Sequence, residues 1–194
     1  MFNLILFGPP GSGKGTQATK IIEKYKLKHL STGDLLRAEK KSGSELGKKI
    51  AKLINNGNLV PDEMVQEMVK TFVFNNKKCN GFIFDGFPRT VAQAEWLKDM
   101  LNPVNAEVNI LLHLHVDDNI LVERILERGK SSGRDDDKDV SIINNRIEVY
   151  HNITQPVMDF YKSQGKYRKV DGIGSIDEVF DRICNVIDSE TSQN

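Results

Sequence analysis

The stretch FNLILFGPPGSGKGT, residues 2–16, joins an apolar run to a glycine-rich turn. Continuous rather than alternating apolarity is typical of a strand that is covered on both faces, as in a parallel sheet wrapped by helices. In the turn, Gly8, Gly13 and Lys14 occupy the fixed positions of the pattern G-x-x-x-x-G-K. Backbone N–H groups in such a turn point at phosphate oxygens, and the dipole of the following helix adds favourable partial charge. The stretch therefore predicts a nucleotide-binding strand, turn and helix.

One position departs from this pattern. Gly15 follows Lys14, where the pattern has a Ser or Thr hydroxyl for Mg²⁺, and the hydroxyl comes one residue later at Thr16. The alternative is a tight strand-to-helix turn whose glycines fall there by chance. The placement, the lysine and the hydroxyl together favour phosphate binding, but they do not say what is done with the phosphate.

Composition bounds the class of protein. The 194 residues suggest one compact domain, and a hydrophobic content of 39% is enough for a single core. Lys and Arg (27) balance Asp and Glu (27), so no overall field draws the chain toward nucleic acid or an anionic membrane. An anion-binding site would therefore depend on basic residues gathered in one place.

The N-terminal apolar run and the two cysteines argue against exported, membrane-spanning and disulfide-rich proteins. No basic region precedes the N-terminal apolar run, and no stretch approaches the ~20 apolar residues of a membrane span. We therefore expect a soluble, cytoplasmic protein. Cys79 and Cys184 lie far apart without metal-ligand spacing, so neither a disulfide framework nor a zinc site is expected.

Strand-like and helix-like patterns alternate along the chain. Further strands are predicted at 28–31, 81–85, 109–116 and 167–171. Apolar residues at helical spacing lie between them: Ala18, Ile21, Ile22 and Tyr25; Met64, Met68 and Phe72; and Val140, Ile143, Ile147, Tyr150, Ile153 and Val157. This alternation predicts an α/β fold with a parallel sheet, in which Met64 and Met68 belong to the helix core.

Two segments break the alternation. Residues 31–60 predict two helices without a strand, divided by Ser42 and Gly43, and such an insertion suits a movable flap. Residues 127–139, ERGKSSGRDDDKD, predict a polar loop between two long helices that is too hydrophilic for the core.

The nonapeptide GFIFDGFPR, residues 81–89, predicts a second part of the site. Asp85 ends an apolar run, so it is expected at the carboxyl end of a strand, where open parallel sheets bind ligands and where a carboxylate can direct Mg²⁺. Gly86 and Pro88 turn the chain and bring Arg89 into the same crevice. A helix-capping aspartate beside a solvent-exposed arginine is the alternative.

Four arginines form a third signal. Arg124 and Arg128 share a helix face, Arg134 lies in the polar segment, and Arg146 is on the next helix. Each is by default a solvated surface charge, and Glu123 and Glu127 are available as partners. Together with the phosphate loop, the four favour phosphoryl transfer, which requires stabilisation of spread negative charge.

Several motifs in order resemble the adenylate kinases of the nucleoside monophosphate kinase family. They are GPPGSGKGTQ at 8–17, LSTGDLLR at 30–37, GNLVPDE at 57–63, FDGFPRT at 84–90 with Gln93, and SGRDDD at 132–137 with Arg146. The resemblance runs from residue 2 to about residue 188. The family's loop has the form G-K-G-T, in which the second glycine leaves room for the phosphates of both nucleotides. This accounts for Gly15.

The resemblance implies an α/β P-loop three-layer sandwich with a five-stranded parallel sheet. Its core would comprise residues 1–30, 61–128 and 136–194, with a nucleoside-monophosphate-binding flap at 31–60 and a lid at 129–135. The activity implied is reversible transfer of the terminal phosphoryl group of MgATP to AMP, giving two ADP for adenine nucleotide balance and synthesis. The lid is too short to hold the zinc subdomain of long-lid relatives. ATP and AMP are the implied partners, and a monomer without nucleic acid or membrane partners is expected.

The resemblance also assigns roles to residues. ATP would be bound by Gly11, Ser12, Gly13, Lys14, Gly15, Thr16, Arg128 and Gly174. AMP would be bound by Thr32, Arg37, Asn58, Leu59, Val60, Gly86, Phe87, Pro88, Arg89, Gln93, Arg134 and Arg146. Catalysis would fall to Lys14, Arg89, Arg124, Arg134 and Arg146, and Asp85 would hold Mg²⁺ through water.

Two rival interpretations remain. Pyrimidine monophosphate kinases share these motifs but usually have Ala in place of Thr32 and an Asn-containing sequence in place of Gln93, so both residues favour AMP. A nucleotide-responsive module that transfers nothing is the rival from another class. A second nucleotide pocket argues against it.

Overall fold

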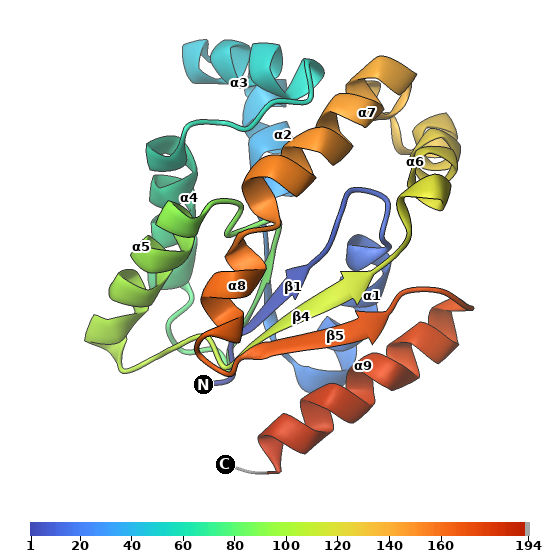
Figure 1. Cartoon of the computed structure of the whole chain (residues 1–194). Helices are drawn as coiled ribbons and strands as arrows, with labels where there is room; N and C mark the ends of the chain where they lie inside the picture. Colours follow the sequence, from blue (N-terminus) through green and yellow to red (C-terminus); the bar gives the residue numbers. More distant parts are fainter. Residues whose placement is uncertain (193–194) are drawn as a thin grey trace.

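Five short strands form one parallel sheet in the computed structural model, which describes residues 1–192 (Figure 1). The strands are β1 (Leu4–Phe7), β2 (Lys28–Ser31), β3 (Phe82–Asp85), β4 (Ile110–His115) and β5 (Tyr167–Asp171). Their spatial order is β2-β3-β1-β4-β5. All five predicted strands and the parallel arrangement are confirmed.

The order places β1 at the centre of the sheet. Leu6 pairs with Asp85 of β3 on one side and with Leu112 of β4 on the other. The turn after β1 therefore emerges at the middle of the carboxyl edge, beside the end of β3. Ligands bind at this position in open α/β sheets, since neighbouring connections leave in opposite directions.

The helices cover both faces of the sheet and extend beyond its carboxyl edge (Figure 1). They are α1 (Lys14–Tyr25), α2 (Thr32–Ser42), α3 (Glu45–Asn55), α4 (Asp62–Asn75), α5 (Val91–Leu101), α6 (Asp118–Ser132), α7 (Val140–Val149), α8 (Val157–Lys162) and α9 (Ile176–Thr191). Shorter helical turns also lie between these elements. They are the 3₁₀ turns Asn102–Val104 and Asp135–Asp137 and the π-helical turn Tyr150–Thr154. None of the helices described within residues 1–192 combines the length and apolarity needed to cross a bilayer.

Alternate residues of β1 belong to two different cores. Leu4 and Leu6 pack in the cluster that contains α1 and α9, whereas Ile5 and Phe7 pack in the cluster that contains α4, α5 and α8. Both faces of the strand are thus covered, which explains why its apolar run is continuous rather than alternating.

The helical insertion at 31–60 is built as two helices with a sharp break. Gly43 ends α2 in the left-handed conformation (φ 72°), which glycine adopts without steric cost. The Ser44 hydroxyl then accepts a hydrogen bond from the Gly47 N–H and caps α3. The predicted division at Ser42 and Gly43 is confirmed.

The prediction of a polar loop over 127–139 is wrong in two respects. Residues 127–132 form the last turns of α6, which ends at Gly133 in the left-handed conformation. Asp136 and Asp137 are buried, although the segment had been expected outside the core. Their burial is possible because arginines pair with both carboxylates, which offsets the cost of removing the charges from water.

Two helix predictions also need correction. The apolar stripe over 140–157 does not form one α-helix, because a π turn starts at Tyr150, where the Gln155 N–H donates to the Tyr150 carbonyl, and Pro156 follows without an N–H. Two residues of the stripe, Val140 and Ile153, are about half exposed. In α4, Met64 and Met68 are only partly buried. The fully buried stripe is the adjacent one: Val65, Val69 and Val73.

We expect Phe84→Ala to lower the free energy of unfolding by roughly 3–5 kcal/mol, because the Phe84 side chain is fully buried in a strand between two others and leaves a cavity. Urea denaturation followed by circular dichroism measures the change. Phe74→Ala is the matched control: Phe74 is exposed on α4, so less than about 1 kcal/mol is expected. Equal losses in the two variants would contradict this account of the core.

Candidate functional site

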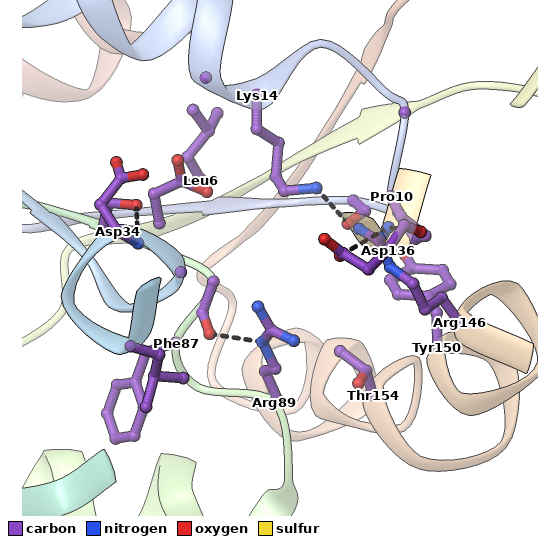
Figure 2. A pocket seen from close by; sticks show the side chains of 18 of the residues that line it. Leu6, Pro10, Lys14, Asp34, Phe87, Arg89, Asp136, Arg146, Tyr150 and Thr154 are labelled. Carbon is purple, nitrogen blue, oxygen red and sulfur yellow. Dashed lines mark hydrogen bonds and ion pairs between the residues drawn. The ribbon is translucent and has the colours of Figure 1, made fainter. Parts of the chain in front are cut away.

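A cleft of about 720 Å³ opens at the carboxyl edge of the sheet (Figure 2). Its wall comes from the β1–α1 turn, the ends of β2 and β3, α2, the α3–α4 connection, α6 and the α7 segment through Thr154. Polar and charged side chains from segments more than 100 residues apart thus meet in one cavity. Large clefts of this kind are the usual location of small-molecule sites.

The β1–α1 turn presents unsatisfied donors to this cleft. Gly13 precedes α1 in the left-handed conformation (φ 95°), and no side chain caps the helix. The N–H groups of the first helical turn have no intrahelical partner, so an anion can bind there. Gly11, Gly13, Gly15 and Thr16 all line the cleft.

Lys14 lies over this turn. Its Nζ donates to the carbonyls of Gly8 (2.7 Å) and Pro9 (2.8 Å), which holds the ammonium at the mouth of the loop. Burial lowers the pKa of Lys14 to about 8; Asp85 opposes the shift, and nearby arginines add to it. Because Lys14 is shielded from water, a bound phosphate would stabilise its charged ammonium group in place of solvent.

Arginines form the opposite wall. Arg89 Nε donates to the Gly86 carbonyl (2.8 Å), so the turn after β3 fixes the direction of its guanidinium (Figure 2). Burial and the charge of Arg146 lower the pKa of Arg89, with Asp85 opposing. Burial and the charge of Arg37 likewise lower the pKa of Arg134. Repulsion among these cations favours a bound polyanion.

Two buried aspartates hold the arginines of α6 and α7. Asp137 accepts two hydrogen bonds from Arg128 (2.7 and 2.8 Å) and one from Arg146 (2.6 Å). Asp136 lies 2.9 Å from the same Arg146 nitrogen. Burial raises the pKa of Asp137, but the hydrogen bonds from Arg128 and Arg146 outweigh it and hold the pKa below its ordinary value. The carboxylate is therefore ionised and fixes both guanidinium groups.

A model of the adenylate kinase family matches residues 6–166. The chain belongs to the adenylate kinase family. An adenylate kinase of Bacteroides thetaiotaomicron is 47% identical over 188 residues, which cover 97% of this chain and 99% of that relative. An adenylate kinase of Flavobacterium psychrophilum is 48% identical over 189 residues, which cover 97% of this chain and all of that relative. The similarity thus extends over nearly the whole chain, including both sides of the cleft.

Most residues expected from the family resemblance line this one cleft. They are Gly11, Gly13, Lys14, Gly15, Thr16, Arg37, Asn58, Leu59, Val60, Asp85, Gly86, Phe87, Pro88, Arg89, Arg124, Arg128, Arg134 and Arg146. Asp85 ends β3 as predicted, with its Oδ2 3.5 Å from the Nε2 of His29. The roles of these residues toward each nucleotide stay predictions.

Four expected residues do not line the cleft. Ser12 is a buried residue of the β1–α1 turn, and Thr32 is buried with its hydroxyl donating to the Gly86 carbonyl (2.8 Å). Gln93 is 2% exposed and is hydrogen-bonded to the Arg89 N–H and to Asp62. Gly174 lies in the connection after β5. Their contacts with nucleotide stay predictions.

The cleft also includes residues that sequence reasoning did not select. Tyr150 and Thr154 come from the π turn, and Asp136 and Asp34 contribute carboxylates. Two of them had a signal in the sequence: Tyr150 is four residues after Arg146, and Asp34 is three before Arg37, so each pair shares a helix face. In the structure, Asp34 accepts a hydrogen bond from Arg37 (2.5 Å).

We expect Asp137→Asn to lower the free energy of unfolding by roughly 3 kcal/mol at neutral pH, since it removes a buried charge that two arginines face. Because the pKa of Asp137 is depressed in the folded state, this contribution is complete above its ordinary value of 3.8 and is lost as pH falls below that value. Denaturation at several pH values should show the difference between wild type and variant narrowing below about pH 4.

Asp135→Asn is the control for that measurement. Asp135 is two residues away and exposed, and it pairs with Lys40 and Lys138 on the surface, so a much smaller loss of stability is expected. A similar loss in both variants would show that Asp137 has no special role in holding the arginines.

Proposed function

We propose that the protein catalyses reversible transfer of the terminal phosphoryl group of MgATP to AMP, giving two ADP, and so serves adenine nucleotide balance and synthesis. The observation that carries the proposal is one cleft with a phosphate loop on one side and arginines on the other, in a chain of the adenylate kinase family. A protein that only senses one nucleotide has no use for a second group of anion-binding residues.

The chemistry asks the protein to position groups rather than to form a covalent intermediate. In direct in-line transfer, charge spreads over the oxygens of the moving phosphoryl group, and cations at fixed positions stabilise it. Lys14 would neutralise phosphate oxygens of ATP from the loop, and Arg89 would hold the α-phosphate of AMP. Arg128 would bind ATP, and Arg124, Arg134 and Arg146 would surround the group in transfer. The hydrogen bonds that fix Arg89, Arg128 and Arg146 support this assignment, since preoriented charges need no reorganisation during reaction.

The residues at the end of β3 fit Mg²⁺. Asp85 and Thr16, the latter in the first turn of α1, both line the cleft, so a carboxylate and a hydroxyl offer oxygen donors, which Mg²⁺ prefers. Asp85 would hold the ion through water. When bound with ATP, Mg²⁺ neutralises phosphate charge. No group of three or more metal-ligating side chains occurs within residues 1–192, and we propose no zinc site.

We further propose that residues 31–60 act as a flap and residues 129–135 as a short lid on a core of residues 1–30, 61–128 and 136–194. Contacts of the flap support this: Lys40 lies 3.4 Å from Asp135, and Asn145 of α7 donates to the Asn56 carbonyl (2.8 Å). Closure of both segments would exclude water and so protect ATP from hydrolysis.

The test of the function is product analysis after mixing protein, Mg²⁺ and ATP with AMP, CMP, UMP or GMP in separate reactions. Fast ADP formation with AMP alone supports the proposal. Faster turnover with CMP or UMP would make the protein a pyrimidine monophosphate kinase. ATP binding without transfer to any acceptor would leave the nucleotide-responsive module.

We propose a monomeric, cytoplasmic protein without nucleic acid or membrane partners, which rests on the family resemblance and the balanced charge of the chain. Light scattering during size-exclusion chromatography measures the mass in solution.

We expect Arg89→Ala and Arg134→Ala each to lower kcat by ~10³-fold or more, because a well-placed arginine contributes that much to phosphoryl transfer. Steady-state kinetics with ATP and AMP measures the loss, and circular dichroism checks the fold. Arg168→Ala removes the same side chain from β5, where Arg168 pairs with Glu190, and should leave kcat nearly unchanged. A near-normal rate in either cleft variant would remove that arginine from the catalytic set.

We expect kcat/KM for ATP to fall as pH rises above about 8, roughly tenfold per pH unit, because the charged form of Lys14 is the one that binds phosphate. The sign follows from the lowered pKa: the ammonium is charged below pH 8 and loses its proton above it. Lys14→Arg, whose guanidinium stays charged, should have a lower but pH-independent kcat/KM over this range. An equal decline in this variant would assign the titration to another group.

A further inference from the structure

Asp62, the first residue of α4, lies in a partly buried hydrogen-bond network with α5, whose one buried side chain is Gln93. Its Oδ1 accepts from the Gln93 side-chain nitrogen (2.7 Å), and its Oδ2 accepts from the Thr90 hydroxyl (2.9 Å). The Gln93 side-chain oxygen accepts from the Arg89 backbone N–H (2.7 Å). Asp62 and Gln93 are 31 residues apart, so this network joins the end of the helical insertion to the turn after β3.

The chemistry of the partners sets the direction of every bond. A backbone N–H can only donate, so the Arg89 N–H requires the oxygen of the Gln93 amide. An ionised carboxylate can only accept, so Asp62 requires the nitrogen. Thr90 uses its lone pair to accept from the Gln93 backbone N–H, which leaves its proton for Asp62. The amide of Gln93 therefore has one stable orientation.

The network lies between two segments that line the cleft. Asp62 is two residues after Val60, and Arg89 is itself part of the wall. Gln93 is nearly buried, and its two bonds leave one N–H and one oxygen lone pair of the amide for further use. These two positions form a donor and an acceptor in fixed order beside the proposed acceptor pocket.

We propose that Asp62 is a positioning residue that fixes the Gln93 amide and thereby selects a 6-aminopurine over a 6-oxopurine as the phosphoryl acceptor. The inference rests on the proposed function, because it assumes that the base of the acceptor lies against Gln93. Adenine presents a 6-amino donor beside the N1 acceptor, which complements the fixed amide. A 6-oxopurine presents a carbonyl beside an N1–H, so both hydrogen bonds are mismatched.

A flipped amide would match the 6-oxopurine, but the network opposes the flip. The Gln93 oxygen would then face the Asp62 carboxylate, and its NH₂ group would face the Arg89 N–H. Each contact would place two acceptors or two donors together at the buried Gln93 side chain, where unsatisfied polar groups are costly. The Asp62 carboxylate therefore fixes which end of the Gln93 amide is the nitrogen and which is the oxygen.

The experiment compares AMP with IMP, which differ in base only at position 6 and the N1 proton. Binding of each is measured by titration calorimetry without ATP, and kcat/KM is measured with MgATP. In the wild type, AMP should be preferred by ~10³-fold or more, as expected for a site that reads a base through hydrogen bonds.

Two variants and one control test the role of Asp62. Asp62→Asn keeps the shape but can donate to a flipped amide, and Asp62→Ala removes the partner. Both should reduce the preference for AMP over IMP by about tenfold or more. Glu63→Gln neutralises the adjacent, exposed carboxylate in the same turn of α4 and should leave the preference unchanged. Thermal unfolding confirms that each variant is folded.

The outcomes are distinct. A merely structural role for Asp62 would weaken AMP and IMP equally and leave their ratio intact, which would overturn the inference. An equal fall in the AMP-to-IMP preference of Glu63→Gln would also overturn it, because the loss of any negative charge at the start of α4 would then have the same effect. Failure of the wild type to form ADP from AMP would instead refute the proposed function, and the AMP and IMP affinities would still report on Asp62.

Discussion

Repulsion among like charges is the constraint on which this site depends. Seven cationic side chains line the cleft in residues 1–192: Lys14, Arg37, Arg89, Arg124, Arg128, Arg134 and Arg146. The chain as a whole has equal numbers of acidic and basic residues, so the cationic excess in the cleft is balanced by an acidic excess elsewhere. Burial is the largest cause of the lowered pKa values of Lys14, Arg89 and Arg134, and neighbouring arginines lower all three further. The folded protein stores an unfavourable charge arrangement that a polyphosphate relieves.

The fold holds these cations together with supports both inside and outside the sheet. The sheet fixes the phosphate loop after its central strand, and the turn after β3 fixes Arg89. Arg128 and Arg146 are instead held by Asp137, on a 3₁₀ turn outside the sheet. One carboxylate therefore links the guanidinium groups of α6 and α7 to each other, so the two charges keep a fixed separation without support from the sheet.

Local patterns in the sequence predicted the parts of the structure that local physics decides. The strands, the glycine-rich turn and the break at Gly43 depend on apolar runs and on residues with special backbone freedom. The burial of Asp137 could not be predicted in this way, because hydrophilicity alone excludes a carboxylate from the core. It depends on two arginines, nine residues to either side, whose helices meet only in the folded state. The Asp62–Gln93 pairing and the exposure of Val140 and Ile153 likewise follow from tertiary contacts.

The strand order has a consequence at the margins of the sheet. With β1 at the centre, the two edge positions fall to β2 and β5, which are four and five residues long. Each carries an exposed lysine, Lys28 and Lys169 respectively. A strand from another molecule that paired with either edge would have to bury that ammonium group or lie beside it, which opposes edge-to-edge aggregation. The arrangement that centres the phosphate loop thus also leaves only short, cationic edges for unwanted strand addition.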